Sequence, residues 1–172
     1  MKKIRLLTFS ALMAAMITVF TAFIGHINVG INGGYIHFGD TLIYIGAALL
    51  PWPYAMAAAA IGGGLANLLT APMWTIATII IKSLITIPFS NKGRKIINFR
   101  NVVAAIAAFF ISAAGYYLAE GLIFGSLAAI WTSVSGSLIQ SGGSLVFFVI
   151  IGLVLDKMNF KAKFFMGDDY NG

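Results

Sequence analysis

Long apolar runs, broken at only a few points, restrict the fold of this chain more than any other feature. Of its 172 residues, 60% are hydrophobic and only 9% are charged. A soluble domain would have about a quarter of its residues charged, whereas about 20 apolar residues in a helix cross a bilayer. Helices satisfy their own backbone hydrogen bonds in lipid. The sequence therefore predicts an all-α integral membrane protein.

Six segments are predicted to cross the membrane as one domain over residues 1–172. Their approximate bounds are 4–24, 41–50, 54–69, 75–87, 102–118 and 137–155. Residues 25–39 are expected to form an external loop, and residues 120–136 are expected outside between the last two segments, with a partial helix within residues 122–135 as an alternative. Six crossings use roughly 120 residues. The remainder leaves no room for an attached ATPase domain.

The basic residues gather in three clusters that predict the orientation of the chain. The clusters are Lys2, Lys3 and Arg5; Lys92, Arg94, Lys95 and Arg100; and Lys157, Lys161 and Lys163. Each cluster flanks an apolar segment, as cytoplasmic lysines and arginines do in membrane proteins. Both termini are therefore expected in the cytoplasm. The same placement argues against nucleic acid as a partner, although the net charge is +6.

Polar residues recur at helical spacing in the last four segments. They are Gly63, Asn67 and Thr70; Thr75, Thr78, Lys82 and Thr86; Ser112, Tyr116 and Glu120; and Ser133, Ser137, Gln140, Ser141 and Ser144. Spacings of three and four residues place each set on one face of a helix. Because lipid cannot satisfy polar groups, the four faces are expected to point inward, toward each other or a wet cavity.

Lys82 lies in the middle of an apolar run, where a buried ammonium costs at least ~3 kcal/mol. One interpretation is a contact with a substrate or a gate. The other is structural, either a side chain that reaches the cytoplasmic interface or an ion pair with Asp40 or Glu120. Asp40 likewise has two interpretations, as the cap of the helix that starts at Thr41 and as a site residue.

Aromatic and amide side chains extend this candidate binding site. Trp74 and Trp131 lie at the predicted outer ends of helices, where they either anchor the protein at the interface or stack on a flat ring. Hydrogen bonds to the edge of such a ring are expected from Asn67, Glu120 and Gln140. The predicted site is completed by Tyr35, His37, Tyr116 and Ser137.

No catalytic residue, metal or cofactor is predicted. The chain has no cysteine, and both histidines, His26 and His37, fall in one loop. Carboxylates outside the tails come from Asp40 and Glu120, which are too few for a metal or acid–base centre.

Two small-residue patterns point to close helix packing. Ala11 and Ala15 have the spacing that lets another helix approach, and Gly62-Gly63-Gly64 is typical of a packing contact. The glycines lack the lysine and hydroxyl partners of a phosphate-binding loop.

The whole layout resembles the substrate-binding S components of energy-coupling-factor (ECF) vitamin transporters. The resemblance rests on the pattern from Ala11 to Ala15 and on the stretches Gly33–Asp40, Gly62–Leu69 and Ile79–Leu84. Within this family, the chain is similar to the branch that binds hydroxymethylpyrimidine, a thiamine precursor. Pyridoxine and thiamine are the alternative substrates.

The resemblance implies a division of labour in the bacterial cytoplasmic membrane. This subunit would bind the vitamin outside and topple to release it inside. A transmembrane coupling (T) subunit and two cytoplasmic ATPases would drive that movement, and Ala11 and Ala15 would contact the coupling subunit. The alternative from another class is a self-sufficient channel or facilitator, with Lys82 and Glu120 along the path.

Overall fold

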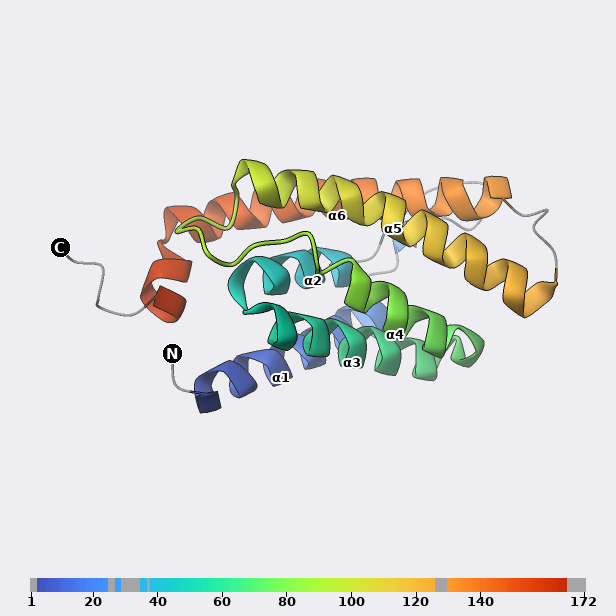
Figure 1. Cartoon of the computed structure of the whole chain (residues 1–172), viewed down its shortest axis with the longest axis horizontal. Helices are drawn as coiled ribbons and strands as arrows, with labels where there is room; N and C mark the ends of the chain where they lie inside the picture. The colour runs from blue at the N-terminus through green and yellow to red at the C-terminus, as the bar shows by residue number, and fades with distance from the viewer. Residues whose placement is uncertain (1–2, 25–26, 29–34, 37, 126–129, 167–172) are drawn as a thin grey trace.

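The computed structural model describes residues 3–24, 27–28, 35–36, 38–125 and 130–166, which are almost entirely helical (Figure 1). The α-helices in these ranges are α1 (Lys3–Val19), α2 (Phe38–Leu49), α3 (Trp52–Thr70), α4 (Thr75–Leu84), α5 (Phe99–Phe124) and α6 (Ile130–Lys157). Shorter helical turns are η1 (Phe20–Ile24), η2 (Pro72–Trp74) and η3 (Ala162–Met166). The predicted all-helical class is confirmed. Within the predicted external loop, strands β1 (Ile27–Asn28) and β2 (Tyr35–Ile36) form one short antiparallel pair.

Several of these helices are apolar enough to lie in a membrane. The segments Lys3–Ile24, Phe99–Phe124 and Gln140–Lys157 have the length and hydropathy of membrane spans, and Phe38–Leu49 and Pro72–Leu84 are shorter apolar helices. Their outer faces carry large hydrophobic side chains, as lipid contact requires. The chain is therefore a multi-pass membrane protein. Six crossings and cytoplasmic termini stay predictions.

Successive helices run in alternating directions, so the start of α1 and the turn η3 lie at the same end of the molecule (Figure 1). Helices α1, α3 and α4 pack on one side, α5 and α6 pack on the other, and α2 lies between them. The loop that joins α4 to α5 reaches the same end as the two termini of the described chain.

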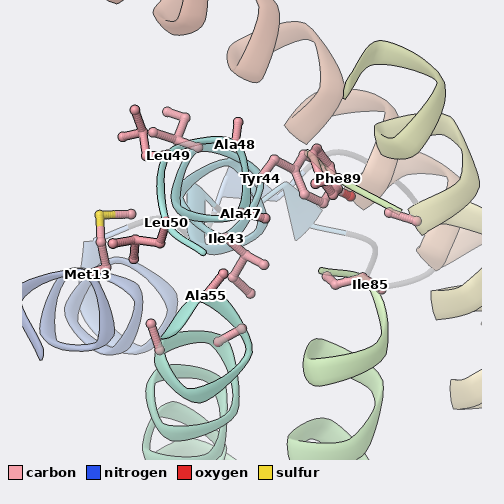
Figure 2. Close-up of a cluster of buried hydrophobic side chains, with 14 of the residues drawn as sticks. Met13, Ile43, Tyr44, Ala47, Ala48, Leu49, Leu50, Ala55, Ile85 and Phe89 are labelled. Carbon is pink, nitrogen blue, oxygen red and sulfur yellow. The ribbon is translucent and has the colours of Figure 1, made fainter. Parts of the chain in front are cut away.

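Helix α2 is the centre of the core, because nearly every residue from Gly39 to Leu49 is buried. Figure 2 shows its side chains directed toward Met13 of α1 on one side, Ala55 of α3 on another, and Phe89 on a third. Tyr44 of α2 stacks on Phe89 with ring centroids 5.3 Å apart. A helix that is apolar all round is stable only when it is surrounded in this way.

The last two helices are longer than predicted. Residues 120–136 were expected outside between the last two segments, with a partial helix as an alternative; α5 continues to Phe124 and α6 begins at Ile130. Gly125 ends α5 in a left-handed conformation, with φ of 66°, which glycine adopts without strain. Glu120 and Ser133 were already expected on the polar faces of these helices, and the two helices extend further into the stretch than their predicted bounds.

Helix α4 is shorter than the predicted segment 75–87 and ends at Leu84. After a turn, the chain continues in non-helical conformation to Asn98, where the next helix starts. Ile85, Phe89 and Ile96 of this stretch are buried. Pro88 explains the break, since proline lacks the N–H that would continue the helix.

Candidate functional site

A buried carboxylate of α2 is the centre of a polar cluster inside the bundle. Nζ of Lys82 lies 2.6 Å from Oδ1 of Asp40, and both side chains are almost completely buried. Nε2 of Gln140 donates to the other carboxylate oxygen at 2.7 Å. Three helices that are far apart in sequence, α2, α4 and α6, thus meet at one charged pair and one amide.

This geometry decides between the structural interpretations of Asp40 and Lys82, while their role in binding stays a prediction. Asp40 is not the cap before Thr41, because α2 begins at Phe38 and Asp40 lies inside its first turn. A carboxylate in that turn still interacts favourably with the helix dipole. Lys82 is only 3% exposed, so it does not reach an interface. Its ion-pair partner is Asp40, one of the two carboxylates considered.

Thr78 joins a second set of polar groups to this pair. Asn67 of α3 donates through Nδ2 to Oγ1 of Thr78 at 2.5 Å, and the same Oγ1 lies 3.2 Å from the hydroxyl of Tyr116 on α5. The ammonium of Lys82 lies 5.5 Å from the centroid of the Tyr116 ring. Because Lys82 follows Thr78 by one helical turn, α4 connects the two sets. Thr78 belonged to the predicted polar face but was not among the predicted site residues.

Aromatic rings border the cluster at the end of the bundle where α4 begins. Trp74 and Tyr116 meet edge to face with centroids 6.0 Å apart, and Trp74 lies at the same distance from Phe124. The last residue was not predicted, because the fifth helix was expected to end before it. These rings offer faces for stacking next to groups that donate and accept hydrogen bonds.

Gly63 of α3 determines how closely α4 approaches. A Cβ at this position would lie 3.1 Å from Cγ of Lys82 and 3.3 Å from Cγ2 of Thr78. Its neighbour Gly62 likewise allows the close approach of α1, since a Cβ at Gly62 would lie 2.7 Å from Cβ of Ile17. The glycines therefore act as packing contacts, as the sequence indicated. The contact of Gly63 with Lys82 and Thr78 was not predicted.

Further hydroxyl groups lie buried in the same bundle. Ser112 of α5 is almost fully buried, and its oxygen forms no hydrogen bond within the described ranges. Tyr44 of α2 and Ser141 of α6 are also buried, and their hydroxyl groups interact with each other. Ser141 directly follows Gln140. Buried hydroxyl groups normally have partners, so Ser112 is a candidate for a contact with a bound molecule.

The structure brings together a large part of the predicted site. The predicted residues that it joins through contacts are Asp40, Asn67, Trp74, Lys82, Tyr116 and Gln140. Glu120 follows Tyr116 by one helical turn and is partly exposed. Thr70 was expected to face inward, but it is exposed because it lies at the end of α3. That exposure removes it from the polar centre.

Some predicted residues cannot be assigned to the cluster. Tyr35 lies in β2, where its backbone pairs with Asn28, but its side chain is outside the described part of the structure. His37 is outside it altogether. Trp131 and Ser137 belong to α6, and their side chains are likewise outside. The role of these four residues stays a prediction.

The site has polar and aromatic groups but no arrangement for a metal ion. Among the described residues, no three histidine or carboxylate side chains come together. Asp40 and Lys82 compensate each other's charge, so this pair adds polar groups but no net charge to the cluster. Such a centre suits an uncharged molecule with a flat ring and hydrogen-bonding edges.

The predicted coupling residues lie on another face of the molecule. Ala11 and Ala15 are exposed on α1, whereas Met13, Ala14 and Ile17 of the same helix are buried against its neighbours. The exposed alanines leave a shallow surface on which another helix fits closely.

A comparison with known protein families finds a match to one family model. The family model described as "ECF-type riboflavin transporter, S component" matches residues 1–157. No curated protein matches the chain. The match covers every helix from α1 to α6, and therefore all residues of the cluster.

Proposed function

The chain belongs to the family of S components of ECF-type riboflavin transporters, and we propose that it binds riboflavin or a closely related uncharged vitamin at the cluster around Asp40 and Lys82. It is the substrate-binding subunit of an importer rather than an enzyme. The observation that carries the proposal is the continuous set of contacts from Gln140 through Asp40, Lys82 and Tyr116 to Trp74.

The chemistry of the cluster favours this substrate class. Riboflavin has a flat heteroaromatic ring and a polyhydroxylated side chain, so it needs aromatic faces at one end and hydrogen-bonding groups at the other. Trp74, Tyr116 and Phe124 provide the faces, and Asn67 and Gln140 provide amide groups. A neutral ligand is preferred over cationic thiamine, because the ion pair already balances the charge of the centre.

The substrate expected from the sequence, hydroxymethylpyrimidine, is replaced as the first candidate. The family match gives it no support and names riboflavin instead. A single small pyrimidine would also contact only part of a cluster that draws on α2 to α6. The direct test is therefore a comparison of the two compounds on the same protein.

We propose that import requires partner subunits. A transmembrane coupling (T) subunit would bind the surface around Ala11 and Ala15, and two ATPases in the cytoplasm would supply energy. The chain would span the bacterial cytoplasmic membrane six times with both termini inside. Toppling of the whole subunit would then carry the bound vitamin from the outer to the inner face.

Fluorescence titration of the purified protein tests ligand binding. Riboflavin fluorescence is expected to be quenched on binding, because its ring stacks against aromatic side chains, whereas hydroxymethylpyrimidine at equal concentration should not compete. Trp74→Ala and Gln140→Ala are each expected to weaken binding about tenfold or more. Trp52→Ala is the matched control, since Trp52 is an exposed tryptophan at the start of α3. Equal affinity in all three variants would exclude this location.

Reconstitution tests the division of labour. Proteoliposomes should accumulate riboflavin only when the coupling subunit, the ATPases and ATP are present. Flux of riboflavin through the chain alone, at a similar rate, would contradict the proposal and would favour a self-sufficient facilitator.

A further inference from the structure

The loop between α4 and α5 carries a group of cations on an ordered frame. We call residues 90–100, which include the first two residues of α5, the basic loop. Lys92, Arg94, Lys95 and Arg100 are all exposed on it. Positive charge beside an apolar segment would by itself satisfy the rule for membrane orientation, with no need for an ordered loop.

Asn101 fixes the basic loop from the side of α5. This residue is fully buried, and its side chain accepts from the N–H of Ser90 at 2.8 Å and donates to the carbonyl oxygens of Ser90 and Ile96 at 3.1 and 2.9 Å. Asn98 accepts from the N–H of Asn101 at 2.9 Å and thereby caps α5. One side chain thus ties together two separate points of the basic loop.

Asp156 of α6 fixes the basic loop from the opposite side. Its two carboxylate oxygens accept from the backbone N–H groups of Ile96 and Ile97 at 2.7 and 2.8 Å. Residues 41–119 contain no aspartate or glutamate. The carboxylate of Asp156 therefore bonds to the backbone of the basic loop, while Lys92 and Lys95 are exposed and Nε of Arg100 donates to the carbonyl oxygen of Pro88 at 3.3 Å.

The basic loop lies at one end of a lipid-facing stripe. Along α5, large exposed hydrophobic side chains recur at Phe99, Val103, Ile106 and Phe110, and Phe99 is 87% exposed. Spacings of three and four residues place them on one face of the helix. Arg100 follows Phe99 directly, so the cations lie where hydrocarbon gives way to lipid headgroups.

We propose that the basic loop is a preordered binding site for the phosphate groups of anionic phospholipids. The frame from Asn101 and Asp156 presents Lys92, Lys95 and Arg100 at headgroup depth, and Phe99 inserts beside the acyl chains. The bound lipid holds this end of the protein at the membrane surface. The site is separate from the vitamin site and does not depend on the identity of the vitamin.

Native mass spectrometry of the purified chain tests the proposal, with phosphatidylglycerol and phosphatidylcholine titrated in separate series. Phosphatidylglycerol is expected to bind more tightly. The triple variant K92Q/K95Q/R100Q should weaken its binding about tenfold or more. The control variant K3Q/K157Q/K163Q removes the same number of exposed charges from the same end of the molecule. It should retain the binding of phosphatidylglycerol. Equal losses in both variants, or no preference between the lipids, would overturn the proposal.

The variant Asp156→Asn distinguishes two explanations of lipid binding: an ordered site, and simple attraction between opposite charges. This variant makes the protein more positive, so attraction alone would strengthen binding of phosphatidylglycerol. The ordered site predicts weaker binding, because the frame loses a charged acceptor for Ile96 and Ile97. Circular dichroism shows that each variant is folded, and riboflavin binding should stay unchanged in K92Q/K95Q/R100Q. Unchanged lipid binding in that variant, with loss of coupling-subunit binding, would make the basic loop a protein interface instead.

Discussion

The ammonium of Lys82 and the carboxylate of Asp40 lie 2.6 Å apart in the interior of a membrane protein, and Gln140 holds the second oxygen of the same carboxylate. Removal of either charge from such a pair leaves the other buried without compensation, which costs more than loss of the pair as a whole.

The first prediction concerns this pair. Lys82→Met and Asp40→Asn are each expected to lower the free energy of unfolding by about 3–5 kcal/mol, whereas the double variant should lose clearly less than the sum. Thermal unfolding in detergent measures all four proteins. Additive losses would mean that the two charges do not depend on each other.

The second prediction concerns the glycine behind Lys82. Gly63→Ala places a methyl group 3.1 Å from Cγ of Lys82, so the lysine and Thr78 must move. Riboflavin affinity is expected to fall about tenfold, or roughly 1.4 kcal/mol. Gly142→Ala is the matched control, because a Cβ there has no neighbour within 4 Å. The same affinity in both variants would show that Lys82 need not be held in this position.

The third prediction separates binding from transport. Ala11→Leu and Ala15→Leu enlarge an exposed surface of α1 and leave the cluster untouched, so riboflavin binding should stay within about twofold. Uptake by the complete transporter should be lost, because the coupling subunit can no longer approach closely. Ala114→Leu, on an exposed position of α5, serves as control. Normal uptake in the α1 variants would place the coupling surface elsewhere.

The fourth prediction concerns Lys161, beyond the end of α6. Burial lowers the pKa of Lys161 to about 8, and the negative charge of Asp156 partly opposes this effect. The unfolded chain therefore binds the proton more tightly than the folded protein. Between pH 8 and the ordinary lysine pKa, the unfolded state carries more protons, so stability should rise with pH in that range.

The variant Lys161→Met tests the predicted direction of the change in stability with pH. The variant should be more stable than the parent protein at pH 7, where the parent must bury a charge. The difference in unfolding temperature should shrink as the pH rises from 8 to 10. A difference that is constant with pH would show that the folded state does not shift the titration of Lys161.

The sequence determined the membrane character and the approximate helix positions, because apolar length and charge clusters act locally along the chain. It also identified Lys82 as a charge in an apolar run that must be compensated, but it left open whether the side chain finds an internal partner or reaches the interface. It located the ends of the last two helices poorly, because a helix need not end where the bilayer ends: α5 continues to Phe124 and α6 begins at Ile130.

Tertiary structure alone decided which groups meet. Asp40 and Glu120 were equal candidates for Lys82 in sequence, and the packing of α4 against Gly63 of α3 places the lysine beside Asp40. Thr78 became the link to Asn67 and Tyr116 for the same reason. Helical periodicity states which face of a helix is polar, but the partner across from that face depends on how helices distant in sequence cross and how closely they approach.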